Sequence, residues 1–118
     1  MKTSELKGAA LDYAVAKCEG EDSLASCYYD DEGCPMVLEE APDGQQEWEP
    51  STNWSQGGPI IEREKLWVVP CGIYWIAGAS DQELARHPHE GVTPLVAAMR
   101  CFVFMRLGDD VEIPEELT

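Results

Sequence analysis

The residues best suited to chemistry lie in one short stretch, Pro50–Glu64, which combines an indole, an amide, two adjacent glycines and an arginine. Trp54 can stack on a planar group, and Arg63 can engage an anion through two parallel hydrogen bonds. The paired glycines would let main-chain N–H groups approach a ligand closely. We therefore expect a small-ligand site here, with these candidate residues: Trp54, Ser55, Gln56, Gly57, Gly58, Arg63 and, from further along the chain, Arg100.

The same stretch also fits a purely structural interpretation. Glycine and proline together favour a tight turn, and the isoleucines that follow favour a strand. Trp54 would then fill part of the core, and Arg63 would pair with Glu62 or Glu64. Both interpretations stay open at the level of sequence.

Motifs of catalysis and cofactor binding are absent from the sequence. There is no G-x-S-x-G turn, no phosphate-binding loop ending in Lys-Ser or Lys-Thr, and no dinucleotide-binding fingerprint. The cysteines form no C-x-x-C pair, which structural zinc sites usually need. We expect no metal, no cofactor and no enzymatic activity, and we expect these cysteines to be free thiols: Cys18, Cys27, Cys34, Cys71 and Cys101.

The overall charge excludes several classes of partner. The 118 residues include 23 acidic and 8 basic side chains, a net charge of −15, and 44% are hydrophobic. A chain of this length and composition predicts one domain, 1–118, with a real core. Strong acidity argues against direct binding to nucleic acid, and no apolar run approaches the roughly 20 residues that span a bilayer. The N-terminus lacks the apolar region of a signal peptide, so we expect a cytoplasmic protein.

Most of the charge lies in one window, Glu19–Glu49, which holds eleven acids and neither Lys nor Arg. Its glycines and prolines predict an irregular acidic excursion over about 19–49, with one or two short strands near Cys27–Tyr29 and Met36–Leu38. The window fits a solvated loop. It also fits an acidic recognition face, whose candidate residues are Asp30, Asp31, Glu32, Glu39 and Glu40. The acids do not have the spacing of a calcium-binding loop.

Helices are predicted near both ends of the chain. Thr3 can cap a helix that runs to about Lys17 and ends at Gly20, and Thr93, Pro94 and Gly108 mark the ends of a second helix. The second helix is apolar nearly all round, so it is buried on several sides or lies at an oligomer interface. We expect a homo-oligomer.

Strands are predicted between the helices. The candidates are Ile60–Ile61, Leu66–Val69 and Ile73–Ala77, with an edge strand over Val111–Ile113 and a short helix over Asp81–Arg86. The fold class is therefore α+β: a small single domain in which an N-terminal helix and a buried C-terminal helix pack on a short antiparallel sheet.

Several blocks of this sequence resemble one family. They are Met1–Ala16, Pro50–Glu64, Gly91–Leu95, Ala97–Cys101 and Leu107–Val111, about half of the chain. They resemble the phage and prophage family related to the NinX protein of lambda-like phages. Three positions depart from the family pattern: Asn53 stands where an aspartate is expected, Lys65 where a glycine is expected, and Phe102 where a tyrosine is expected.

The resemblance implies a small phage accessory protein in the cytoplasm of a bacterial host. Phage genes of this size often counter host defence, so we expect a protein that binds and sequesters a nucleotide-type ligand. Trp54 would stack on the base, while Arg63 and Arg100 would take the phosphate or carboxylate. The alternative is an acidic, DNA-mimicking inhibitor that docks on a basic host defence protein through Asp30, Asp31 and Glu32. A structural phage component is the third interpretation.

Overall fold

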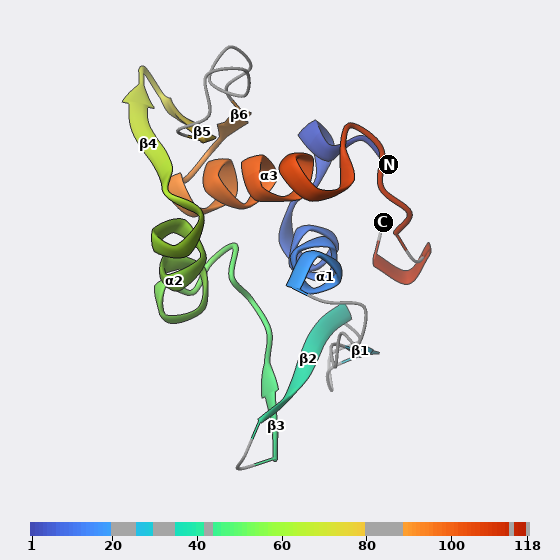
Figure 1. The fold of residues 1–118 in the computed structure, drawn as a ribbon. Coiled ribbons are helices and arrows are strands. Elements are labelled where there is room, and N and C mark those ends of the chain that lie inside the picture. Colours follow the sequence, from blue (N-terminus) through green and yellow to red (C-terminus); the bar gives the residue numbers. More distant parts are fainter. Residues whose placement is uncertain (20–25, 30–34, 42–43, 80–88, 114, 118) are drawn as a thin grey trace.

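The computed structural model describes residues 1–19, 26–29, 35–41, 44–79, 89–113 and 115–117. Within these residues the fold has three α-helices and two small antiparallel sheets, which confirms the predicted α+β class (Figure 1). In chain order the elements are η1 (Thr3–Glu5), α1 (Gly8–Glu19), β1 (Ser26–Tyr29), β2 (Pro35–Ala41), β3 (Gly44–Glu47), α2 (Trp54–Glu64), β4 (Leu66–Cys71), β5 (Tyr74–Ala79), β6 (His89–Gly91), α3 (Pro94–Leu107) and η3 (Glu115–Leu117).

Helix α3 is the centre of the hydrophobic core (Figure 1). Thr93 caps it by accepting a hydrogen bond from the Val96 N–H, and Pro94 occupies the first turn. Helix α1, helix α2 and the sheet β4–β5–β6 all contact it. The apolar surface of α3 is therefore covered within one chain, which confirms that the helix is buried on several sides. Its buried residues are Leu95, Val96, Ala97, Ala98, Met99, Cys101, Phe102 and Val103.

The sheet beside α3 has the order β4–β5–β6, with all neighbours antiparallel. Strand β4 confirms the prediction at Leu66–Val69 and continues to Cys71. It includes Pro70, which is tolerated because β4 is an edge strand of this sheet. Among the described residues, Ile73 at the tip of the β4–β5 hairpin is the most exposed large apolar side chain, at 99%.

Helix α1 begins later than predicted. Thr3 does not cap it, because the Thr3 hydroxyl donates instead to the Gly108 carbonyl after α3. The helix starts at Gly8, whose φ of +56° belongs to the left-handed region that glycine adopts without strain. Leu6, directly before it, is fully buried in the core. The predicted end at Gly20 lies outside the described residues.

Two strand predictions are wrong. Ile60 and Ile61 belong to α2, where Ile60 is buried in the core. Val111–Ile113 forms no strand: the only β-bridge there joins Lys2 to Asp110, while the Val111 N–H donates to the carbonyl of Met1. The short helix predicted over Asp81–Arg86 lies outside the described residues.

The acidic window is more regular than expected. Instead of one or two short strands, its described residues form three, β1, β2 and β3, paired antiparallel in that order. The predicted strand positions at Cys27–Tyr29 and Met36–Leu38 fall in β1 and β2. In Figure 1 this sheet extends away from α3, on the far side of α1.

Candidate functional site

The block Pro50–Glu64 forms a helix, α2, and this decides where its side chains lie. Asn53 caps the helix by accepting from the Ser55 N–H, so asparagine serves where an aspartate is expected. The helix ends at Lys65, whose φ of +55° lies in the left-handed region that favours the glycine expected there. Trp54 and Arg63 are nine positions apart, about 13 Å along a helix axis, so α2 separates them instead of bringing them together.

Gly57 and Gln56 of α2 have structural partners. The Gly57 N–H donates to the Asn53 carbonyl, and Gln56 Oε1 accepts from the Glu49 N–H at 2.6 Å. A Cβ at Gly57 would lie 2.4 Å from the Pro50 carbonyl oxygen and 2.7 Å from Leu95 Cδ2. Gly57 therefore allows α2 to approach the turn before it and the first turn of α3.

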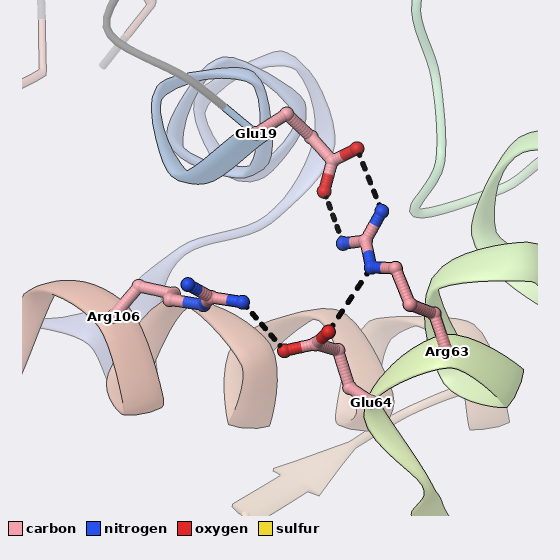
Figure 2. Close-up of polar contacts among 4 residues, drawn as sticks. All are labelled: Glu19, Arg63, Glu64 and Arg106. Carbon is pink, nitrogen blue, oxygen red and sulfur yellow. Dashed lines mark hydrogen bonds and ion pairs between the residues drawn. The ribbon is translucent and has the colours of Figure 1, made fainter.

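Arg63 is engaged by two carboxylates. Its Nη1 lies 3.1 Å from Glu19 Oε2, its Nη2 donates to Glu19 Oε1, and its Nε lies 3.0 Å from Glu64 Oε2. Arg106 donates to the second Glu64 oxygen at 2.8 Å (Figure 2). Both guanidinium groups also lie over the ring of Phe102, at 5.6 and 5.5 Å from its centroid. This network joins the C-terminal ends of α1, α2 and α3.

The pKa values follow from these contacts. Hydrogen bonding to Glu19 is the main cause of the raised pKa of Arg63. Burial of Glu64 acts to raise its pKa, but the hydrogen bonds and positive charges of Arg106 and Arg63 outweigh burial and hold the pKa below its ordinary value. Pairing of Arg63 with Glu64, expected from the structural interpretation of the block, is confirmed.

Arg100 is also engaged, at a different place. Its Nε donates to the Leu6 carbonyl and its Nη1 to the Glu90 carbonyl, both at 2.7 Å. It therefore ties the segment before α1 to β6. The structure does not bring Arg100, Arg63 and Trp54 together.

Trp54 stands apart from both arginines at the start of α2. It is 57% exposed, so the expectation that it fills the core is wrong. It lines a surface cavity of about 180 Å³ with Ser51, Thr52, Thr93, Pro94 and Leu95. None of these six side chains is charged, and three carry hydroxyl groups. The cavity thus offers an exposed aromatic face beside an uncharged polar wall.

Ser51, on the hydroxyl-bearing side of the cavity, is hydrogen-bonded to Asp12 of α1 in the interior. Asp12 is buried; its Oδ1 accepts from the Ser51 N–H at 2.9 Å, and its carbonyl accepts from the Trp48 indole at 2.9 Å. These contacts fix the turn that leads into α2. Sequence reasoning missed Ser51, Thr52, Thr93, Pro94 and Leu95 as cavity residues, because only tertiary packing places the start of α3 beside the start of α2.

The remaining expectations concern acids and cysteines. Asp30, Asp31 and Glu32 lie outside the described residues, whereas Glu39 and Glu40 lie in β2. In the described part of the chain no cluster of His, Cys, Asp or Glu could hold a metal ion. Cys18, Cys71 and Cys101 are free thiols, and burial raises the pKa of Cys18 to about 12 and that of Cys101 to about 11. No described helix has the length and apolar character needed to cross a membrane.

These features define a small α+β protein with a surface cavity at the start of two helices and a charged network at the other end of α2. The chain matches the family model described as Bacteriophage P22, NinX over residues 2–106. It belongs to this phage protein family, which confirms the resemblance and supports a phage accessory protein. A comparison with curated proteins found no match.

Proposed function

We propose that this protein is a non-enzymatic phage accessory protein that counters host defence by binding a small nucleotide-type ligand. The observation that carries the proposal is the exposure of Trp54 at the edge of the 180 Å³ cavity. Leaving most of an indole in water is unfavourable without a partner, and a planar base is a suitable partner for its face. The cavity is large enough for one ring-sized group.

The proposal assigns different roles to the predicted residues. Trp54 keeps its role as the stacking residue. Arg63 and Arg100 are already bonded to carboxylates and carbonyls, so recruiting either to a ligand would break the contacts that join α1, α2, α3 and β6. Thr52 and Thr93, which line the cavity, replace them as polar contacts. The Thr93 hydroxyl accepts from the Val96 N–H and so keeps its own proton to donate, and the Thr52 hydroxyl lies 3.4 Å from the Glu49 carbonyl oxygen.

Isothermal titration calorimetry against cyclic and ADP-ribose-like nucleotides tests this proposal. We expect one of them to bind with a Kd of roughly tens of micromolar or below. Trp54→Ala should abolish binding, whereas Ile73→Ala, which removes another exposed apolar side chain far along the chain at a hairpin tip, should not. If no member of the panel binds the unmodified protein, the proposal is wrong.

A second candidate function is favoured by the acidic window. Its residues form a sheet, β1–β2–β3, which could carry carboxylates on a regular framework for docking to a basic host defence protein. In that case affinity should fall steeply with salt. Neutralising Asp30, Asp31 and Glu32 together should then weaken binding more than Trp54→Ala does, and a salt-insensitive interaction would exclude this function.

A further inference from the structure

Two helices begin at the Trp54 cavity. Trp54 is the first residue of α2, which has 11 residues, and Pro94 and Leu95 are the first residues of α3, which has 14. The aligned peptide dipoles give each helix start about half a positive charge. A side-chain cap already occupies one N–H group at each start, because Asn53 accepts from Ser55 and Thr93 accepts from Val96, and Pro94 has no N–H. Two such ends at one cavity amount to about one positive charge, without any basic side chain.

A separate observation also points to a missing partner at this place. Ser51 lines the cavity and is 1% exposed, and its hydroxyl has no hydrogen-bond partner among the described residues. In the described part of the chain, this hydroxyl oxygen is the one buried side-chain polar atom without a hydrogen-bond partner. A buried hydroxyl without a partner is unfavourable by an amount comparable to a lost hydrogen bond. A ligand acceptor in the cavity would supply that partner.

The charge around the cavity limits which ligand group can accept a hydrogen bond from the Ser51 hydroxyl. None of the lining side chains is charged, and behind Ser51 lies the buried carboxyl group of Asp12, which accepts from the Ser51 N–H. The rest of the chain carries a large negative charge, −15 overall. Two helix starts can balance one negative charge, but a second would face the net negative charge of the chain without compensation.

We propose that the cavity seats a singly charged oxyanion, a phosphodiester, while the base attached to it stacks on Trp54. The inference rests on the proposed function and specifies its ligand. The Ser51 hydroxyl donates to a phosphodiester oxygen, and the starts of α2 and α3 face the same group. A phosphate monoester, which carries close to two negative charges at neutral pH, is disfavoured, and a neutral nucleoside leaves Ser51 without its partner.

Three probes that share one base test the inference: adenosine 3′,5′-cyclic monophosphate, adenosine 5′-monophosphate and adenosine. Calorimetry at one pH and salt concentration should show that the cyclic phosphodiester binds at least about tenfold more tightly than adenosine, because a hydrogen bond to a charged group and two helix starts favour it. The 5′-monophosphate should bind more weakly than the cyclic compound.

Ser51→Ala separates ligand binding from folding. It should lower the affinity for the cyclic compound at least about tenfold and leave the affinity for adenosine unchanged. The variant should melt at or above the temperature of the unmodified protein, because it removes a hydroxyl that lacks a partner. Ser4→Ala, at an exposed serine outside the cavity, is the matched control and should leave all three affinities unchanged.

The outcomes distinguish this inference from the proposed function. If the three probes bind equally through Trp54, or if the monophosphate binds most tightly, the inference is wrong and the proposed function stands. If none of these probes and no member of the wider nucleotide panel binds, both are wrong. The comparison of probes needs only the unmodified protein, so it decides the matter even if Ser51→Ala does not fold.

Discussion

Gly57 and Gly58 are adjacent in α2, and the structure predicts opposite effects when each is replaced by alanine. A Cβ at Gly58 would meet only Trp54 Cε3, at an ordinary 3.9 Å, whereas a Cβ at Gly57 would lie 2.4 Å from the Pro50 carbonyl oxygen. Alanine lowers the conformational entropy of the unfolded chain at both sites, which stabilises by about 0.4–1 kcal/mol where the native structure accepts it. At Gly57 that gain is opposed by overpacking against a main-chain atom and Leu95, which costs about 1–3 kcal/mol or more.

Thermal melting measures both effects on one scale. For 118 residues the entropy of unfolding is about 250 cal/mol/K, so 1 kcal/mol shifts the melting temperature by about 4 °C. Gly58→Ala should raise the melting temperature by about 2–4 °C. Gly57→Ala should lower it by up to about 10 °C, since the entropic gain offsets part of the overpacking cost. Equal melting temperatures for the two variants would refute the close approach of α2 to Pro50 and α3.

Three further predictions concern two carboxyl groups and a thiol. Because the folded-state pKa of Glu64 is lowered, its ionisation stabilises the fold above pH about 4.5, and this contribution is lost as pH falls below that value. Denaturant unfolding should therefore show that Glu64→Gln lowers the free energy of unfolding by about 1–3 kcal/mol at pH 7 and by less at pH 3. Asp12→Ala leaves the buried Ser51 N–H without its acceptor and should cost about 1–3 kcal/mol in the same assay. Cys101, buried and with a thiol pKa raised to about 11, should resist alkylation at pH 8 until the protein unfolds, as followed by mass spectrometry.

The Glu64 prediction has a matched control variant, and each of the three predictions has an outcome that would contradict it. Glu112→Gln alters an exposed acid and should show no comparable loss at pH 7. A destabilisation by Glu64→Gln that stays the same from pH 7 to pH 3 would contradict the role given to Arg63 and Arg106. An Asp12→Ala variant as stable as the unmodified protein would contradict the buried contact to Ser51, and rapid alkylation of native Cys101 would contradict its burial.

Local signals in the sequence were sufficient for α3 and for the strand at Leu66–Val69. Thr93 and Pro94 specify a helix start from their own chemistry, and a run of β-branched and aromatic residues specifies a strand. Local signals misled at α2, where Gly57, Gly58 and Pro59 favour a turn and Ile60–Ile61 favours a strand. The Asn53 cap, the close approach at Gly57 and burial of Ile60 against the core favour the helix instead.

The candidate site could be predicted only in part, because local sequence signals do not specify contacts between distant segments. Trp54 was identified by its chemistry, but whether an arginine nine positions away reaches the same ligand depends on whether the segment is a loop or a helix. Arg63 also pairs with Glu19, 44 residues away, and Arg100 with the Leu6 carbonyl, 94 residues away, and no local pattern specifies such contacts. The Ser51 hydroxyl was missed because an unpartnered atom is a property of the packed structure.

The most direct test of the ligand site is an ¹⁵N–¹H NMR titration with adenosine 3′,5′-cyclic monophosphate. We expect the indole N–H of Trp54 and the main-chain amides of Thr52, Thr93 and Leu95 to shift together and to saturate at one stoichiometry. Resonances of the β4–β5 hairpin tip around Ile73 should stay in place. Shifts confined to the hairpin, or no shifts at any concentration of the probe, would contradict a phosphodiester site at the starts of α2 and α3.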